Sequence, residues 1–220
     1  LLEEVLLTIQ NQKDGIIFTT FSSHIARLKS IIEFSKKIDR EIILLGRSMD
    51  KYSKAAINSK IAPFLQDVKI SKYSKQDEKT LFKVNKNKER YMVVCTGHQG
   101  EPDSILERFS RNDLPFRINQ GDNIIFSSSV IPTPINKEQF SKMEVRLKKN
   151  KPRIFRDVHV SGHAGREDLR DILNIVRPKH VIPSHGGFDK TTPMISLLKE
   201  MGYKEGKNAH LMENGGILRL

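Results

Sequence analysis

Two histidines in the C-terminal part of the chain, His163 and His185, stand where an apolar run ends and polar residues begin. His163 follows Val158-His-Val160, and His185 lies in Pro183-Ser-His-Gly-Gly187. Imidazole titrates near neutral pH and is the commonest metal ligand in proteins, so the pair is suited to proton transfer, metal binding or both. The alternative is that both are hydrogen-bonded loop histidines with a purely structural role.

Four loops rich in small, hydroxylated or glycine residues also stand where strands are expected to end. They are Thr20-Phe-Ser-Ser-His24, Thr96-Gly-His-Gln-Gly-Glu-Pro102, Ser127-Ser-Ser129 and Ser161-Gly-His-Ala-Gly165. In a parallel sheet, ligands collect at the carboxyl ends of strands, where helix N-termini offer free amides to anions. Each loop alone is also typical of a turn or a helix N-cap, but four in one chain favour phosphate binding.

Apolar runs that alternate with helical patterns must position these loops. The runs at 15–21, 41–46, 91–95 and 123–126 predict strands. Helical patterns cover about residues 23–37 and begin again near Met49 and near Glu101, while residues 61–88 are irregular around a short strand and helix. Strands buried on both faces and separated by helices predict an α/β fold with a mostly parallel sheet.

The same alternation resumes after about Phe155. Strands are predicted at 158–160 and 180–182, helices at about 165–176 and 192–201, and a β-hairpin over 209–220 around Asn214-Gly215. The first of these helices carries an apolar stripe that is expected to pack on the sheet: Leu169, Ile172, Leu173 and Val176. A right-handed crossover would then bring His163 and His185 to one sheet edge. The basic stretch 148–152 predicts a boundary between residues 1–150 and 151–220.

Composition points to a polyanionic partner. The 220 residues carry a formal charge of +12 and have a pI near 9.8, and Lys and Arg clusters bind phosphates by displacing counterions. A solvated basic surface is the alternative. Cys95 is the only cysteine, which excludes an intramolecular disulfide and a CxxC zinc site and fits a reducing cytoplasm. No apolar run approaches the ~20 residues that a bilayer requires, so no membrane partner is expected.

The first ten residues read as part of a helix. Leu2, Val5, Leu6 and Ile9 have helical spacing, and neither an initiator Met nor an N-cap residue precedes them. The basic segment and cleavage site of a signal peptide are also missing from this stretch. These features predict a fragment of a longer protein.

Five blocks of sequence follow one another in a fixed order. They are Thr19-Thr-Phe-Ser-Ser-His-Ile-Ala-Arg27, Thr96-Gly-His-Gln-Gly-Glu-Pro102, Ile125-Phe-Ser-Ser-Ser-Val-Ile-Pro132, Val160-Ser-Gly-His163 and Arg177-Pro-Lys-His-Val-Ile-Pro-Ser-His185. Together they resemble RNase J-type ribonucleases of the metallo-β-lactamase/β-CASP family. The first three are similar to that family's entry into the β-CASP domain, its TGxQGEP loop and its phosphate-contacting serine loop, and the last two to its motifs B and C. The resemblance covers nearly the whole chain and is weakest over 61–88.

The resemblance implies that a β-CASP domain, residues 1–150, interrupts a metallo-β-lactamase domain of αββα type whose returning segment is residues 151–220. His163, as motif B, is expected to be catalytic beside the scissile phosphate. His185, as motif C, is expected to ligate one of two zinc ions, and a His at this motif favours RNA over DNA. The residues expected to bind RNA or its phosphates are Ser22, Ser23, His24, Gly97, Gln99, Gly100, Glu101, Ser127, Ser128, Ser129, Ser161 and Gly162.

The chain departs from the family pattern in two respects. The HxHxDH signature, which supplies most zinc ligands, and the acidic motif A are not in this sequence, and both are expected upstream of Leu1. Gly187 replaces the more usual Glu after His185-Gly, and Asp189 is a candidate substitute.

The implied function is part of a zinc-dependent ribonuclease that hydrolyses RNA phosphodiester bonds, as a 5′-to-3′ exonuclease with endonuclease activity as a second mode. This chain alone is expected to bind single-stranded RNA in the cytoplasm and to cleave nothing. Its expected protein partners are the remainder of the metallo-β-lactamase domain and, in a homodimer, a second copy. The alternatives are an endonuclease of the polyadenylation-factor branch and a non-catalytic RNA-binding or scaffold subunit.

Overall fold

A computed structural model of the chain describes residues 2–9, 13–72, 78–159 and 164–219. The chain divides into two compact units, residues 1–159 and residues 160–220. Within the described ranges, none of the helices combines the length and the apolar character that a bilayer crossing requires.

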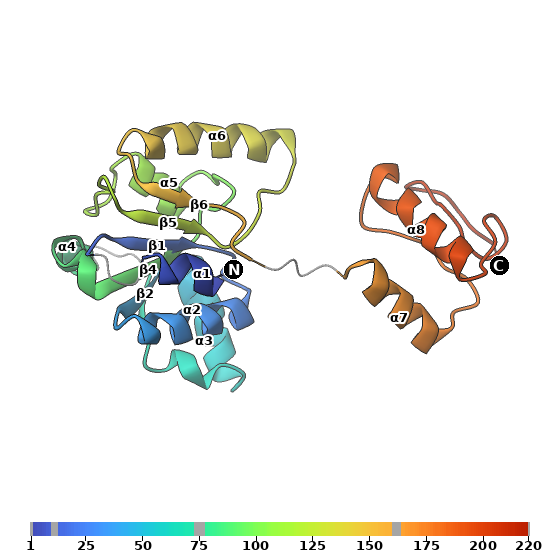
Figure 1. Ribbon diagram of the computed structural model, residues 1–220, viewed down its shortest axis with the longest axis horizontal. Helices are drawn as coiled ribbons and strands as arrows, with labels where there is room; N and C mark the ends of the chain where they lie inside the picture. The colour runs from blue at the N-terminus through green and yellow to red at the C-terminus, as the bar shows by residue number, and fades with distance from the viewer. Residues whose placement is uncertain (1, 10–12, 73–77, 160–163, 220) are drawn as a thin grey trace. The chain divides into compact units, whose positions relative to one another are not determined.

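Six strands of the first unit form one sheet, in which every neighbouring pair is parallel (Figure 1). They are β1 (Ile16–Thr19), β2 (Glu41–Leu45), β3 (Lys69–Ser71), β4 (Tyr91–Cys95), β5 (Asn123–Phe126) and β6 (Arg153–Phe155). Their order across the sheet is β3-β2-β4-β1-β5-β6, so the first strand of the chain lies in the interior of the sheet. The predicted α/β fold with a mostly parallel sheet is confirmed.

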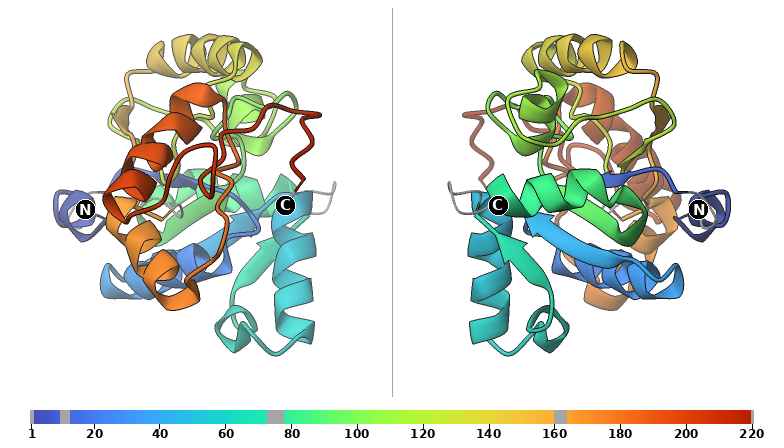
Figure 2. Two further views of the ribbon diagram at one scale, coloured as in Figure 1. Left: turned by 90° about the vertical axis from the view of Figure 1, so that its right-hand side faces the viewer. Right: turned by 90° about the vertical axis from the view of Figure 1, so that its left-hand side faces the viewer.

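Alternate strand residues contribute to two cores, one on each face of the sheet. Ile16 and Phe18 of β1 are buried on one face and Ile17 on the other. The first face is covered by α2 (Ile25–Lys37) and α3 (Arg47–Asn58), and the second by α4 (Glu78–Lys86), α5 (Ile105–Ser110) and α6 (Pro134–Lys148). In both views of Figure 2, α6 (gold) and α2 (blue) lie on opposite sides of the sheet. Because successive strand side chains point to opposite faces, strands covered on both sides are apolar in their interior.

Short elements complete the first unit. The helix α1 (Leu2–Leu7) precedes β1, and the single turns η1 (Pro63–Leu65) and η3 (Lys88–Arg90) lie in the connections before β3 and β4. Ile9, just after α1, is fully buried in the same core as α2. The predicted helix at the start of the chain is therefore present and packs on the sheet's α2 face through the residue that follows it.

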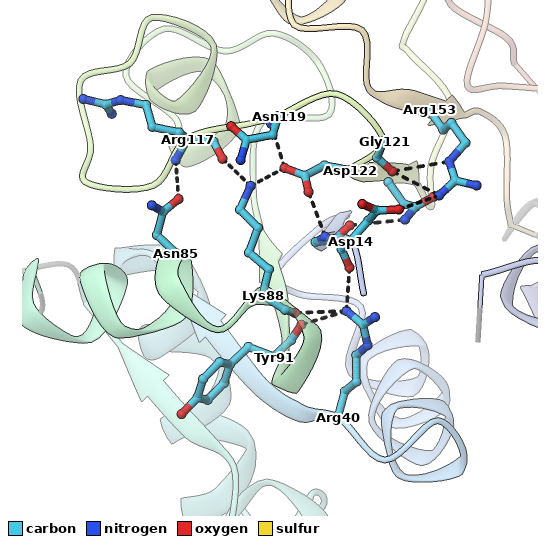
Figure 3. Close-up of polar contacts among 12 residues, drawn as sticks. Asp14, Arg40, Asn85, Lys88, Tyr91, Arg117, Asn119, Gly121, Asp122 and Arg153 are labelled. Atoms are coloured by element: carbon cyan, nitrogen blue, oxygen red, sulfur yellow. Dashed lines mark hydrogen bonds and ion pairs between the residues drawn. The ribbon is translucent and has the colours of Figure 1, made fainter. Parts of the chain in front are cut away.

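A buried ion pair joins the segments at the amino ends of the three central strands (Figure 3). The ammonium group of Lys88 bonds the carboxylate of Asp122 and the carbonyl oxygen of Arg117, the latter at 2.6 Å, and the Lys88 and Asp122 side chains are 9% and 3% exposed. Asp122 also accepts hydrogen bonds of 2.7 Å from the backbone amides of Gly15 and Asn119. Because Gly15 precedes β1, Lys88 precedes β4 and Asp122 precedes β5, this network fixes the central strands at their amino ends.

The second unit contains the helices α7 (Arg166–Val176) and α8 (Phe188–Glu200), close to the two helices predicted there. Its buried core consists of Leu173, Ile195, Leu198 and Ala209. The prediction that the apolar stripe of α7 packs on a sheet is wrong. Only Leu173 of that stripe is buried, against α8, whereas Ile172 and Val176 are 51% and 63% exposed, because the described part of this unit contains no sheet.

Three strand predictions for the C-terminal region are also wrong for the described residues. The last strand of the sheet is β6 rather than 158–160, because Asp157 adopts a φ of +54° that ends the extended run. Residues 180–182 contribute only an isolated bridge, between Val181 and Ala209. Within the described residues the predicted hairpin over 209–220 does not form, because residues 209 and 210 lie against Val181 instead of the end of the chain. The segment around Asn214-Gly215 is a turn without flanking strands.

Candidate nucleic-acid interface at the carboxyl ends of the strands

The loops that follow β1, β4 and β5 lie together because these three strands are neighbours in the sheet. The amide of Thr20 donates to the carbonyl oxygen of Cys95 at 3.1 Å, and the amide of Ser127 donates to that of Thr19 at 3.0 Å. The Thr20 hydroxyl donates to the carbonyl oxygen of Ser127 at 3.3 Å. Three of the four predicted loops therefore meet at one edge of the sheet, as expected for parallel strands.

One cation, Arg27, reaches into this group of loops from the first turn of α2. Its guanidinium donates to the carbonyl oxygen of Ser127 at 2.7 Å and to Thr20 Oγ1 at 3.5 Å. Burial lowers the pKa of Arg27 from its usual value, yet a guanidinium remains charged in proteins. Arg27 is absent from the predicted site residues, although its place one turn into a helix after a hydroxyl-rich loop points to it.

His24 and Ser23 lie at the start of the same helix. The Nδ1 atom of His24 accepts a hydrogen bond of 3.2 Å from the amide of Arg27, so His24 caps α2. Both His24 and Ser23 are exposed, whereas Ser22 is buried. The imidazole of His24 thus has a structural role that fixes the helix bearing Arg27.

The three serines of the loop after β5 lie in different environments. Ser127 is buried, and its hydroxyl donates to the carbonyl oxygen of Val158 at 3.0 Å. Ser128 is also buried, and its Oγ has no hydrogen-bond partner among the described residues. Ser129 is exposed, and its hydroxyl donates to Asp157 Oδ1 at 2.6 Å. Ser127 therefore holds the following chain in place, whereas Ser128 keeps an unused hydroxyl and Ser129 is accessible.

Asp157 and His159 extend this group, although neither is among the predicted site residues. The Nε2 atom of His159 lies 3.5 Å from Ser129 Oγ. Burial, followed by the charges of Arg27 and His24, lowers the pKa of His159, while the carboxylate of Asp157 acts in the opposite direction. The ring is therefore mainly neutral at pH 7. His159 lies in the run 158–160, which the sequence predicts as a strand, and local pattern does not show its polar neighbours.

Gln99 connects the loop after β4 to the loop after β5. Its side-chain Nε2 donates to the carbonyl oxygen of Ser129 at 2.9 Å, and its Oε1 accepts from the amide of Ile131 at 2.7 Å. Its backbone amide donates to the carboxylate of Glu101 at 3.0 Å. Because both ends of the Gln99 amide are used within the chain, this geometry supports a positioning role for Gln99 and not a direct contact with a ligand.

Two glycines allow the loop after β4 to approach its neighbours. Gly97 has a φ of +122°, and a Cβ there would lie 2.7 Å from the Cβ of Leu106. Gly100 has a φ of +75°, and a Cβ there would lie 2.5 Å from the backbone nitrogen of Phe140 in α6. Both distances are too short for any side chain, so Gly97 and Gly100 determine the shape of the loop.

His98, between these glycines, is buried without a polar partner. It is 2% exposed, and neither ring nitrogen has a hydrogen-bond partner among the described residues. Burial first, and then the charge of Arg27, lowers the pKa of His98 to about 4, so the ring is neutral at pH 7. The ring of Phe21 packs edge-on against it, with 4.0 Å between centroids. His98 is not a predicted site residue, since its position in the TGxQGEP loop is not one that the resemblance marks.

A cavity of about 990 Å³ opens beside this histidine, at the carboxyl ends of β1, β2, β3 and β4. Ser22, Thr96, His98 and Glu101 line it from the loops after β1 and β4. Basic side chains line it as well, from the start of α3, the end of β3 and α5: Arg47, Lys72 and Arg108. Two predicted residues, Ser22 and Glu101, therefore share a cavity whose basic lining the sequence did not reveal.

His185 is the one predicted metal or catalytic residue within the described part of the chain; His163, Ser161 and Gly162 lie outside it. It is exposed and has a φ of +70°. The described residues contain no group of three or more His, Cys, Asp or Glu side chains that could hold a metal ion. A zinc site needs three or four protein ligands, so the described residues do not form one by themselves, and His185 could supply one ligand.

Comparison with known proteins gives two family matches. Residues 13–144 match the family described as "Ribonuclease J, beta-CASP domain", and residues 151–212 match the "Zn-dependent metallo-hydrolase RNA specificity domain". The second match begins next to the predicted boundary after residue 150, whereas the first compact unit continues to residue 159, because β6 adds to its sheet.

Curated relatives agree with these matches. Ribonuclease J of Methanocaldococcus jannaschii is 43% identical over 219 residues, which cover 99% of this chain and 49% of that protein. Ribonuclease J of Pyrococcus abyssi is 36% identical over 220 residues, covering 100% of this chain and 48% of that protein. The chain thus spans about half the length of these relatives. The β-CASP match covers more than half of the chain, and the chain belongs to the ribonuclease J β-CASP family.

Proposed function

We propose that this chain holds single-stranded RNA along the carboxyl edge of its β-CASP sheet, as part of a zinc-dependent ribonuclease that hydrolyses phosphodiester bonds. The observation that carries the proposal is the convergence of three interlocked, hydroxyl-rich loops with the Arg27 guanidinium at one edge of the sheet. Amides, hydroxyls and a guanidinium bind phosphates without demanding base identity. The formal charge of +12 adds general attraction to a polyanion.

The predicted RNA-binding residues divide into two roles under this proposal. Ser22, Ser128 and Ser129 have hydroxyls at the edge of the sheet and are proposed to meet phosphate oxygens, with Ser23 nearby on the surface. For this contact the Ser129 hydroxyl would exchange its bond to Asp157 for one to phosphate. Gly97, Gln99, Gly100, Glu101, His24 and Ser127 are proposed to act by holding the loops, because their side chains or backbones are engaged within the chain. Ser161 and Gly162 are proposed as phosphate ligands from their motif alone.

The two motif histidines are proposed to have distinct roles. His185 would supply one imidazole ligand to zinc, and His163 would neutralise charge on the scissile phosphate or protonate the leaving oxygen. The family description of residues 151–212 as a Zn-dependent metallo-hydrolase domain supports zinc. The remaining ligands are proposed to come from outside these 220 residues, in keeping with relatives of about twice the length. A bound zinc would supply a Lewis acid and an activated water.

Three properties stay predictions. They are action from the 5′ end with endonuclease activity as a second mode, assembly as a homodimer, and a location in the cytoplasm. A non-catalytic RNA-binding subunit is the second candidate, favoured by the lack of a three-ligand group among the described residues. An endonuclease of the polyadenylation-factor branch is the third, and the TGxQGEP block 96–102 argues against it.

A binding and cleavage assay tests the proposal. We expect the purified 220-residue chain to bind a 3′-labelled single-stranded oligonucleotide weakly, with an affinity that falls as salt is raised, and to leave the RNA intact with or without zinc. Robust zinc-dependent cleavage by the isolated chain would overturn the proposed division of zinc ligands. Absence of any salt-dependent binding would overturn the RNA-holding role.

The serine loop gives a sharper test in a full-length protein that carries this chain. Ser129→Ala is expected to weaken binding to all sequences alike, because phosphate contacts carry no base information. Ser127→Ala is the matched comparison. Because the Ser127 hydroxyl donates to the carbonyl oxygen of Val158, this substitution should lower the free energy of unfolding more than it weakens RNA binding. Unchanged affinity in Ser129→Ala would identify Ser129 as a surface turn residue.

The histidine roles are separated by zinc content. In the full-length protein, His185→Ala should reduce bound zinc, measured by atomic absorption, whereas His163→Ala should keep zinc and lower the cleavage rate by roughly 10²–10⁴-fold, as for loss of a general acid. Equal zinc content and equal rates in both variants would show that both histidines are structural.

A further inference from the structure

The cavity of about 990 Å³ at the carboxyl ends of β1 to β4 has an open helix start in its wall. Gly46, the N-cap of α3, has no side chain with which to cap the helix, and the first-turn residues Arg47 and Ser48 both line the cavity. The first amides of a helix have no partner within it and carry a positive partial charge. Anions bind readily at such a position.

Arg47 adds a full charge at the same place. It is exposed, and within the part of the chain that the structure describes it pairs with no acidic side chain. A cation in the first turn of a helix is repelled by the helix dipole, and an anion bound at the same place would remove this repulsion. By contrast, Lys72 lies 3.6 Å from Asp50, which also binds Lys54.

Carboxylates limit how much negative charge the cavity can accept. Glu78, Glu101 and Asp103 also line it. Asp103 pairs with Arg111 at 3.1 Å, and Glu101 accepts the Gln99 amide at 3.0 Å. With acidic and basic groups together in its lining, the cavity suits a single phosphodiester charge and not a polyphosphate such as a nucleoside triphosphate.

The same cavity is also lined by groups that a nucleobase requires. Phe21 is 38% exposed although it is aromatic, and it lies edge-on over the buried ring of His98. The two nitrogens of His98 have no hydrogen-bond partner among the described residues, and a neutral imidazole offers one donor and one acceptor. Aromatic faces stack on any base. Because a buried polar group left without a partner is costly, a base that stacks on Phe21 and moves its ring away from the His98 nitrogens would supply their missing hydrogen bonds.

We propose that this cavity binds one nucleotide unit of a single RNA strand, with its phosphate at Arg47 and the first amides of α3 and its base against Phe21 and His98. The proposal rests on the proposed RNA-holding function and adds a defined subsite to it. It places that subsite on the β2 and β3 side of the edge, away from the serine loop after β5.

Two substitutions in the 220-residue chain separate the phosphate from the base contact, with fluorescence anisotropy of a labelled single-stranded oligouridylate as the readout. Arg47→Ala should weaken binding and reduce the slope of log K against log salt by about 0.7, since one phosphate contact is lost. Phe21→Leu keeps an apolar cover on His98 and should weaken binding by about fivefold or more with an unchanged slope, since stacking is lost. Arg90→Ala, which removes an exposed cation at the amino edge where Arg90 pairs with Glu41 at 3.7 Å, is the matched control.

Direct localisation uses uridine 3′-monophosphate and ¹⁵N-labelled chain. The amides of Arg47, Ser48 and Met49 should shift on titration, and ATP should compete no better than the monophosphate. The subsite is overturned if the Arg47 and Phe21 variants bind RNA like Arg90→Ala, or if these amides do not move; RNA binding by the unmodified chain would then still support the proposed function. If the unmodified chain binds no RNA, both are overturned.

Discussion

The side-chain amide of Gln99 donates a hydrogen bond of 2.9 Å to the carbonyl oxygen of Ser129, a residue 30 positions later. This bond ties the loop after β4 to the loop after β5, across the end of β1 that lies between them in the sheet. The loops proposed to hold RNA are thus fixed to one another by a bond within the chain, which lowers the entropy cost of binding.

Gln99→Glu tests this tie. The carboxylate can still accept from the amide of Ile131, but it has no N–H to donate to Ser129 and would face that carbonyl oxygen. We expect a loss of roughly 1–3 kcal/mol in the free energy of unfolding, measured with urea, because a buried group loses its partner. Gln120→Glu makes the same charge change at an exposed position and is expected to have little effect. Equal losses in both variants would point to charge and not to the Gln99 tie.

Gly100→Ala should be among the more destabilising substitutions in the first unit. Its Cβ would lie 2.5 Å from the backbone nitrogen of Phe140, so α6 would have to move, and the positive φ of 75° adds strain. Gly202→Ala is the control for the strain alone, since Gly202 has a φ of +89° and nothing lies within 4 Å of its Cβ position. Thermal melts followed by circular dichroism should show a larger decrease in Tm for the Gly100 variant; a decrease no larger than in the control would contradict the close approach.

Lys88→Met should break the buried network at the amino ends of the strands. The Asp122 carboxylate, 3% exposed, would lose its cation and keep only the amides of Gly15 and Asn119. Removing one partner of a buried ion pair costs about 3–5 kcal/mol. The double variant Lys88→Met with Asp122→Asn should recover part of that stability, because no uncompensated charge remains. If the double variant is as unstable as the sum of the two single variants, the two residues do not interact.

His98 makes the stability of the first unit depend on pH. Burial, and then Arg27, lowers its pKa from 6.5 to about 4, so the folded chain binds this proton less well than the unfolded chain. Its contribution is therefore fully present above pH 6.5 and is lost as the pH falls toward 4. At about 1.4 kcal/mol per pKa unit, the loss approaches ~3 kcal/mol.

The variant His98→Gln should flatten the free energy of unfolding between pH 6.5 and 4, measured by urea unfolding at several pH values. His24→Gln removes an exposed histidine from the neighbouring loop after β1, and it should keep the pH dependence of the unfolding free energy seen in the unmodified chain. A slope that survives in His98→Gln would assign the pH dependence to other groups.

Cys95 should report on opening of the sheet. Its thiol is fully buried at the end of β4, and burial, with a smaller effect of Glu101, raises its pKa far above the usual range. Because the thiolate is the reactive form, we expect iodoacetamide to modify the folded chain very slowly and to react quickly in denaturant. Fast modification without denaturant would show that this edge of the sheet opens readily.

Much of the first unit follows from local pattern. The runs that became β1, β2, β4 and β5 are apolar except for Thr19, Glu41 and Asn123 at strand ends, because helices cover both faces of the sheet. The helix α6 was not predicted, since only Phe140, Met143 and Leu147 are buried among its many charged residues. A signal for it existed: Thr133 caps the amide of Asn136 at 3.2 Å, and Pro134 follows at the first helical position.

The interface was predictable in outline and not in its contacts. Hydroxyl and glycine residues after strands pointed to the correct loops, because that position depends on local sequence. The meeting of Arg27 with Ser127, 100 residues apart, depends on the order of strands across the sheet, which local pattern does not encode. β6 was missed for a related reason: a three-residue edge strand that is only half-buried has no distinctive periodicity.

The central place of β1 has a consequence for how the chain folds during synthesis. Ile16 pairs with Met92 of β4 and with Asn123 of β5, which are 76 and 107 residues later (92 − 16 and 123 − 16). At roughly 5–20 residues per second, the ribosome needs about 4–15 s to make the nearer partner. For that time the strand Ile16-Ile-Phe-Thr19 lacks both of the strands that flank it in the sheet. Folding of this domain should therefore be slow, and it should depend on keeping this first strand from associating with other nascent chains.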